Sequence, residues 1–387
     1  MAAAVRILLA ADVHSKIENV YRLGMWLQQR RITPDLTLLC GDLVNVNHNH
    51  DGFASSIPLS QQLGSSTSTV SKSLLEAAEL MAKSRRKQED EEFKLVLDGL
   101  RQISPNLLYV PGNHDPATAF PDFHPSQSLS PESPPDASEL KNLPLWVRMQ
   151  AQTGAVNIHK RLLRLAPNLL VAGFGGSVPE TRYHDRSSTT YPGYPYSEAD
   201  LANGVNRVLR SHRHALPDSA LVSPIVGKFS KVPRSDAHIL VTHCGPAGVG
   251  TTDINKMPHA GPTTRLEAGS YNMRDLLSSP FYQGITEPVF TRDGQLRQRP
   301  NGNVDTPATS PLATPTRSKT AKPFGGILFH AHGHSHSAWG LSHLGTIPII
   351  NPGPLRDGRF AMVTVEQGSS ALASPWTVSG VEFAVLP

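Results

Sequence analysis

Five short clusters of histidine, aspartate and asparagine stand out in the sequence, because each directly follows a short apolar run. They are Asp12-Val13-His14, Gly41-Asp42, Gly112-Asn113-His114-Asp115, Thr242-His243 and Gly333-His334-Ser335-His336. Carboxylate, imidazole and amide ligands without a thiolate suit intermediate divalent ions such as Mn, Fe, Zn or Ni. A carboxylate can also bridge two ions about 3.5–4 Å apart, and such a pair can activate water and neutralise a phosphate. The set therefore indicates a two-metal centre.

The elements that must position these clusters are short apolar runs, which are typical of strands buried on both faces. The runs are Val5–Ala11, Leu36–Cys40, Leu107–Pro111, Leu169–Gly175, His238–Thr242 and Gly326–His332. Helical patterns lie between some of them, at Ile17–Gln29, Ser73–Gln102 and Ser197–Ser211. Strands that alternate with helices predict an α/β fold. Because α/β proteins usually carry their sites at the carboxyl ends of strands, we expect the clusters to meet at one edge of a sheet.

Taken in order, the five clusters closely resemble the signature of the calcineurin-like metallophosphoesterases, which reads D-x-H, G-D, G-N-H-[D/E], H and G-H-x-H. All five blocks are intact. The resemblance extends to THCGPAGVGTTDIN from Thr242, to Gly269-Ser270, and to IINPGPLRDGRFAMVTVE, which ends at Glu366. The resemblance covers the chain from Val5 to about Glu366. Within the superfamily, the sequence is most similar to the small single-domain members.

This resemblance implies a fold and a set of metal ligands. The fold is a four-layer α/β sandwich, in which two mixed β-sheets lie face to face with helices outside. The resemblance assigns Asp42 as a ligand shared by two divalent metal ions. The remaining ligands of the first ion would be Asp12, His14 and His336, and those of the second would be Asn113, His243 and His334.

The resemblance also implies a reaction, the hydrolysis of a phosphate mono- or diester by a hydroxide that bridges the two ions. His114 would not be a ligand but would assist the departure of the leaving oxygen, and Asp115 would orient its ring. The alternative is a catalytically silent scaffold on the same fold that serves protein–protein interaction. All seven ligand positions and His114 are present, so we expect a hydrolase acting on phosphoric ester bonds.

The block around Asp42 bears on the substrate. It reads GDLVNVN and lacks the D-R-G that follows in members resembling protein Ser/Thr phosphatases. We therefore expect a phosphorylated small molecule or nucleotide, including phosphodiesters, in preference to a phosphoprotein.

Three stretches differ in composition from the rest of the chain. Residues 47–70 are rich in Ser, Gln and Asn, whereas 121–139 and 298–323 are dense in Pro, Ser and Thr. Such segments bury too little apolar surface to offset their ordering entropy, so we expect flexible insertions that could recruit protein partners. The remainder predicts a single metallophosphoesterase domain over residues 1–387.

Composition excludes several other classes of protein. A net charge of +4 over 387 residues, with scattered basic residues, does not predict nucleic-acid binding. The two cysteines, Cys40 and Cys244, cannot build a disulfide framework and indicate a reducing compartment. The apolar run near the N-terminus is short and contains Arg6, and no later stretch reaches the ~20 apolar residues of a membrane span. We expect a cytoplasmic protein without a signal peptide.

Four histidines alternate in FHAHGHSHS, but only two of them fit the metal-binding pattern. His334 and His336 follow Gly333 and match G-H-x-H, one for each ion. His330 and His332 precede Gly333 on a predicted buried strand, where a hydrogen-bonded core imidazole is the ordinary expectation. We therefore predict that the four histidines divide at Gly333.

Overall fold

The computed structural model describes most of the predicted framework and little of the predicted insertions. It describes residues 4–45, 72–121, 143–178, 181–182, 196–211, 236–255, 265–283, 324–368 and 376–387. The stretches at 47–70 and 298–323, and all but the first residue of that at 121–139, lie outside this range. Among the described residues, no helix is long and apolar enough to cross a membrane.

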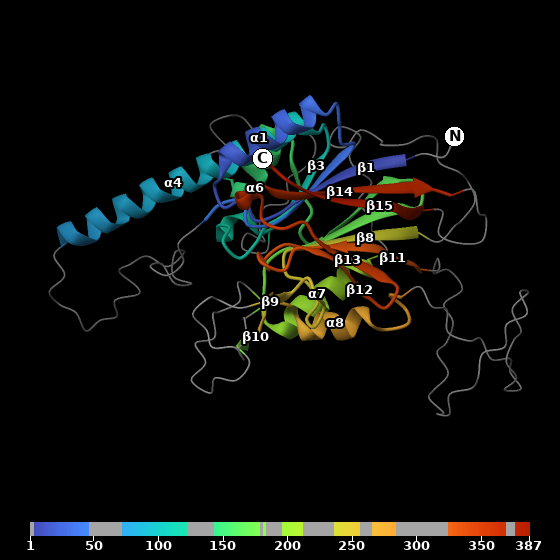
Figure 1. Ribbon diagram of the computed structural model, residues 1–387. Coiled ribbons are helices and arrows are strands. Elements are labelled where there is room, and N and C mark those ends of the chain that lie inside the picture. The colour runs from blue at the N-terminus through green and yellow to red at the C-terminus, as the bar shows by residue number, and fades with distance from the viewer. Residues whose placement is uncertain are drawn as a thin grey trace, which may run out of the picture.

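Two six-stranded mixed sheets lie face to face at the centre of the molecule (Figure 1). The first has the strand order β15-β14-β1-β2-β3-β4, and the second has the order β12-β13-β11-β8-β6-β5. The first sheet consists of β1 (Ala4–Ala10), β2 (Leu36–Cys40), β3 (Leu107–Val110), β4 (Val156–Asn157), β14 (Arg359–Gln367) and β15 (Trp376–Val385). The second consists of β5 (Arg161–Ala166), β6 (Leu169–Phe174), β8 (Asp236–Thr242), β11 (Phe324–Ala331), β12 (Gly340–Leu344) and β13 (Ile347–Asn351).

Helices cover the outer face of each sheet, so the predicted four-layer arrangement is confirmed (Figure 1). The first sheet carries α1 (Ile17–Gln29), α4 (Lys72–Ile103) and α6 (Leu145–Thr153), and the second carries α7 (Glu198–Leu209) and α8 (Tyr271–Leu277). Short 3₁₀ turns occur at η2 (Ala117–Ala119) and η4 (Leu355–Asp357). A small antiparallel sheet is formed by β7 (Thr181–Arg182), β9 (Asp253–Asn255) and β10 (Arg265–Glu267).

The central strands are buried on both faces, as their largely apolar sequences predict. Every residue of β2, β3, β6 and β8 is buried. One face of each sheet points into the space between them, where Leu9 and Leu38 from the first sheet join Val171, Ile239 and Phe329 from the second in one apolar cluster. This cluster holds the two sheets together.

The helices bury one apolar stripe each. In α1 the buried residues Val20, Leu23 and Leu27 recur at spacings of three and four, which places them on one face of the helix. They pack with residues of α4 such as Phe93 and Leu97. The bounds predicted for α1 agree with the structure, and those of α4 and α7 agree to within two residues. The sequence patterns did not reveal α6, α8, β4, β5 or β12 to β15.

Strand direction brings the polar clusters together. The strands β1, β2 and β3 run parallel to one another, and β6, β8 and β11 do the same in the second sheet. The carboxyl ends of neighbouring parallel strands lie at the same edge of a sheet, and here the two sheets face one another. The expected meeting of the clusters at one edge is therefore a consequence of the topology.

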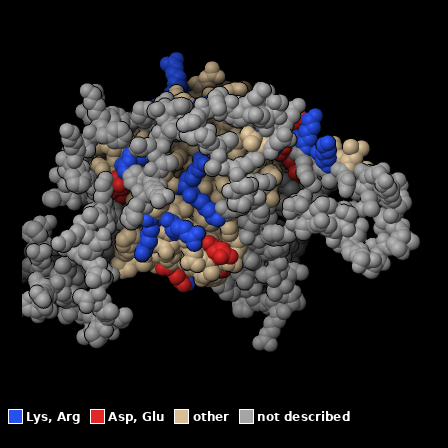
Figure 2. All heavy atoms as spheres, turned by 180° about the vertical axis from the view of Figure 1, so that it is seen from behind, with Lys and Arg blue, Asp and Glu red and all other residues tan. Residues whose placement is uncertain are grey.

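Charged side chains on the face opposite to that of Figure 1 form separate small groups (Figure 2). Lys and Arg lie beside Asp or Glu in several of these groups. On the described part of this face, the basic side chains do not merge into one extended patch.

We predict that Phe329→Ala lowers the free energy of unfolding by about 3–5 kcal/mol, because it removes a fully buried ring from between the two sheets. Leu341→Ala serves as the control, since Leu341 is 45% exposed. Its change should stay within about 0.5 kcal/mol. Chemical denaturation followed by circular dichroism measures both. Equal losses would show that the packing between the sheets is not the main stabilising contact.

Candidate metal centre

The structure brings the predicted ligand residues to one place, at the carboxyl ends of five strands. Asp12 and Asp42 each lie two residues beyond the end of their strand, β1 and β2. His243 follows β8 directly, and Asn113 comes soon after β3. His334 and His336 lie in the turn after β11.

The atoms of the predicted ligands form two groups that share one carboxylate. Within each group the atoms that could hold a metal ion all lie within 4.8 Å of one another. The first group is Asp12, His14, Asp42 and His336, and the second is Asp42, His243 and His334. The amide oxygen of Asn113 lies 2.8 Å from Nε2 of His243, which places Asn113 beside the second group. Asp42 is the member common to both.

The chemistry of these atoms fits a bound cation. The Nε2 atoms of His14 and His336 face one another at 3.1 Å. Oδ2 of Asp42 lies 3.3 Å from Nε2 of His243 and 3.7 Å from Nε2 of His14. Although this oxygen is buried, it has no hydrogen-bond partner in the described part of the chain. Buried acceptors are normally paired, and converging nitrogen and oxygen lone pairs suit a divalent ion.

Several of these residues have an unusual backbone conformation. Asp12, His14, Asp42 and His334 have φ values of 52°, 47°, 54° and 67°, in the left-handed region that L-residues seldom occupy. Such conformations cluster at functional sites, where the surrounding structure holds them in place. Here the sharp turns after the strands aim the side chains at one another.

Two glycines allow the ligand carboxylates to approach the neighbouring backbone. A Cβ atom at Gly112 would lie 2.1 Å from Oδ1 of Asp42, and one at Gly333 would lie 2.9 Å from Oδ2 of Asp12. Both distances are below those that real Cβ contacts show. The glycines of the G-N-H-D and G-H-x-H blocks are therefore required by close packing around the two carboxylates.

Hydrogen bonds to backbone amides and carbonyls hold the predicted ligand side chains in position. The carboxylate of Asp12 accepts from the backbone N–H of His334 at 3.1 Å, and Oδ1 of Asp42 accepts from that of His114 at 2.7 Å. Nδ1 of His243 donates to the carbonyl oxygen of Cys40 at 2.7 Å. This bond leaves Nε2 of His243 available as a ligand, because the second ring nitrogen of a metal-binding imidazole is usually held in this way.

The contacts of Asp115 differ from the expected ones. Its Oδ2 accepts from the backbone N–H of Gly112 at 2.7 Å, and its Oδ1 accepts from those of Leu43 and Val44 at 2.8 and 3.0 Å. Among the described residues, the carboxylate of Asp115 is hydrogen-bonded to these three backbone amides and not to the His114 ring. Asp115 therefore joins the turns after β2 and β3. Burial and the charge of Asp42 raise the pKa of Asp115 to about 7.

Burial and charge set the protonation of the ligands. Burial alone would raise the pKa of Asp12 and of Asp42, but the charges of nearby histidines outweigh it and leave both pKa values lowered. Burial lowers the pKa of His14 to about 4 and that of His334 to about 3. Burial also opposes the charged form of His243, yet Asp42 raises the pKa of His243 to about 9. The centre thus combines ionised carboxylates with neutral imidazoles at His14 and His334, whereas His243 carries a proton at neutral pH. Metal binding requires the neutral form of an imidazole, so an ion at the second group would displace that proton.

The division of the four histidines agrees with the structure. Nε2 of His330 is hydrogen-bonded to Oγ1 of Thr242 at 2.6 Å. His332 donates from Nδ1 to the carbonyl oxygen of Gly333 at 2.9 Å, and its Nε2 lies 3.0 Å from Oγ1 of Thr251. Both rings are fully buried, and neither belongs to a ligand group.

One supporting residue was missed by sequence reasoning. The buried side chain of Asn351, at the end of β13, donates to the carbonyl oxygens of Ser335 at 2.9 Å and Thr251 at 3.2 Å. Its Oδ1 accepts from the backbone N–H of Gly353. Asn351 thereby ties the turn that carries His334 to the loop that follows His243. The sequence Asn-Pro-Gly after an apolar run is typical of a turn. It does not reveal that the asparagine side chain joins two loops by hydrogen bonds.

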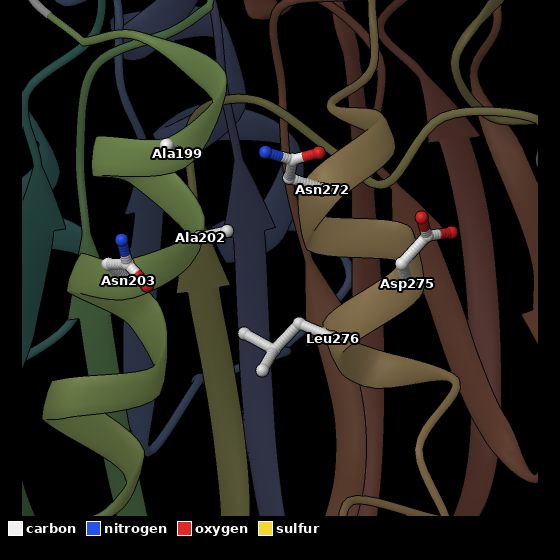
Figure 3. Close-up of a pocket in the computed structure, with 6 residues that line it drawn as sticks. All are labelled: Ala199, Ala202, Asn203, Asn272, Asp275 and Leu276. Atoms are coloured by element: carbon white, nitrogen blue, oxygen red, sulfur yellow. The ribbon is translucent and has the colours of Figure 1, made fainter.

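A shallow pocket of about 300 Å³ lies elsewhere, between α7 and α8 (Figure 3). Its lining residues are Ala199, Ala202, Asn203, Asn272, Asp275 and Leu276. Asp275 is the only titratable residue among them, and none belongs to the ligand groups. The pocket therefore lacks the groups needed for phosphate ester chemistry.

Comparison with known proteins identifies the family. The model of the calcineurin-like phosphoesterases matches residues 5–338, and the chain belongs to this family. It is therefore a hydrolase acting on phosphoric ester bonds, in a family that depends on two metal ions. No curated protein sequence matches the chain.

Several solved structures resemble the chain at low sequence identity. A dimetal phosphatase from Danio rerio is 11% identical with a TM-score of 0.38, over 99% of each chain. The calcineurin-like phosphoesterase YfkN from Bacillus subtilis is 12% identical with a TM-score of 0.34, over 100% of this chain and 91% of the other. The NAD nucleotidase NadN from Haemophilus influenzae is 10% identical with a TM-score of 0.37, over 100% of this chain and 50% of the other. Likenesses at this level carry no argument about the substrate.

We predict that His334→Ala and His336→Ala each reduce bound metal, whereas His330→Ala leaves the metal content unchanged and lowers stability. His330 is hydrogen-bonded to Thr242 in the core, so its loss leaves a cavity and removes a buried hydrogen bond. Elemental analysis after dialysis measures the metal, and thermal unfolding measures stability. Loss of metal from a folded His330→Ala protein would contradict the division at Gly333.

Proposed function

We propose that the protein hydrolyses phosphate mono- or diesters with two divalent ions held at the strand ends. The observation that carries this proposal is the position of Asp42, whose carboxylate belongs to both groups of converging ligand atoms. Asp12, His14 and His336 would complete the first site, and Asn113, His243 and His334 would complete the second. The whole chain would form one such domain.

The donor set supports intermediate divalent ions, namely Mn, Fe, Zn or Ni, because it combines nitrogen and oxygen ligands. The two buried cysteines, Cys40 and Cys244, do not alter this choice. Cys40 is buried, and burial raises the pKa of its thiol, so it stays protonated. When bound, two such ions lower the pKa of a water molecule and draw charge from the phosphoryl oxygens.

His114 is the residue we propose to assist the leaving group. It is partly exposed, unlike the ligand His243, so its ring can reach a bound substrate. Its backbone N–H is fixed by Asp42, and its ring packs edge-on against that of His14 at 5.1 Å between centroids. Donation of a ring proton to the departing oxygen would then occur beside the metal centre. Asp115 would act indirectly, by holding the turn that carries His114.

We propose a phosphorylated small molecule or a nucleotide as the substrate class, and not a phosphoprotein. The turn after Asp42 continues as Leu43 and Val44, both buried and bonded through their backbone to Asp115. It supplies no arginine to a substrate, in line with the missing D-R-G block. A cytoplasmic location remains part of this proposal.

We predict that His114→Ala lowers kcat by about 10²–10⁴-fold while the bound metal stays constant. The assay is release of nitrophenol from mono- and bis-nitrophenyl phosphate by protein reconstituted with Mn²⁺. His343→Ala is the matched control, since His343 is exposed on β12.

Unchanged kcat in the His114→Ala protein would contradict the role of His114. A wild-type protein that binds metal but hydrolyses neither ester would favour the alternative of a silent scaffold.

A further inference from the structure

An arginine on the turn after β13 is anchored next to the first ligand motif. The 3₁₀ turn η4 contains Arg356, whose backbone N–H donates to the carbonyl oxygen of Asp12 at 3.2 Å. The side chain of Asn19 donates to the carbonyl oxygen of Arg356 at 2.7 Å. The N–H of Leu355 donates to the carbonyl oxygen of Ala11 at 2.8 Å. The backbone of Arg356 is thus fixed on both sides beside a ligand residue of the first metal site.

The guanidinium of Arg356 is not used by the fold. Its Nε lies 3.7 Å from a carboxylate oxygen of the adjacent Asp357, and the two side chains are 37% and 50% exposed. Exposed pairs of this kind stabilise a protein little. Among the described residues, the guanidinium makes no other ion pair or hydrogen bond.

A second arginine of the same segment shows the contrast. The guanidinium of Arg359 lies over the ring of Trp339, 4.9 Å from its centroid, and its Nη1 lies 3.5 Å from the carbonyl oxygen of His336. The guanidinium of Arg359 therefore already contacts Trp339 and the turn that carries His336. Arg356 keeps its terminal nitrogens available.

The position of η4 puts Arg356 beside the metal centre. Its backbone N–H is bonded to the carbonyl oxygen of Asp12, a residue of the first ligand group, so its long side chain starts next to that group. An arginine side chain presents several N–H donors in a fork that matches the oxygens of a phosphate.

We propose that Arg356 binds the phosphoryl oxygens of the substrate and of the phosphate product at the edge of the first metal site. This inference rests on the proposed function, because it names a residue that holds the group on which the enzyme would act. Arg356 would supply binding energy and orientation, and no proton transfer. Its partial exposure places it at the mouth of the centre, where a phosphate can exchange.

The test measures binding of inorganic phosphate to the metal-loaded protein by calorimetry. We expect Arg356→Gln to raise the Kd for phosphate about 10- to 100-fold, the effect of losing a hydrogen bond between charged groups. The metal content should stay unchanged, and Arg356→Lys should recover part of the affinity. In turnover assays KM should rise by a similar factor, with little change in kcat.

Arg30→Gln is the matched control. Arg30 is an exposed arginine that lies over Trp26 at the far end of α1, about 20 Å along the helix from the metal centre. Its loss should leave phosphate binding unchanged.

Equal phosphate affinity in the wild-type and Arg356→Gln proteins would overturn the proposal, and so would loss of metal from the variant. A wild-type protein that hydrolyses no ester would contradict the proposed function alone. The phosphate titration would still decide the role of Arg356.

Discussion

The burial of one carboxylate, that of Asp42, is the constraint on which the site depends. Histidines from both sheets approach it: His14 follows β1 of the first sheet, and the other three follow β8 and β11 of the second. Its Oδ2 atom has no hydrogen-bond partner among the described residues. An ionised carboxylate is expensive to bury without compensating charge. The surrounding histidines lower its pKa, and the glycine at 112 lets the backbone approach it. A pair of cations would complete the compensation.

The fold follows from the need to bring distant segments to this carboxylate. Parallel pairing of β1 with β2 and of β8 with β11 directs four turns to one edge of the sandwich. The apolar layer between the sheets holds these turns in register. Asn351 and Asp115 then join the turns to one another through backbone bonds. Stability and ligand geometry therefore rest on the same contacts.

Much of this arrangement could be predicted from the sequence. The runs before Asp12, Asp42 and His243 consist mainly of apolar residues, which predicts buried strands, and the order of the clusters indicates the ligand set. By contrast β12 alternates between partly buried and exposed residues, and β15 is mostly exposed or partly buried and is positioned by its antiparallel pairing with β14. The contacts of Asp115 could not be predicted, because they join backbone amides whose positions depend on the tertiary fold.

The number of metal ions bound by the wild-type protein and by Asp42→Asn tests the shared carboxylate most directly. Asparagine preserves the shape of the side chain and can still accept from the backbone N–H of His114. It removes the charge that both sites would use. We predict two ions per wild-type chain and, in the variant, an affinity lowered at both sites by more than about 100-fold, since even residues behind the ligands contribute 10–100-fold. Retention of one ion at wild-type affinity would contradict the shared role of Asp42.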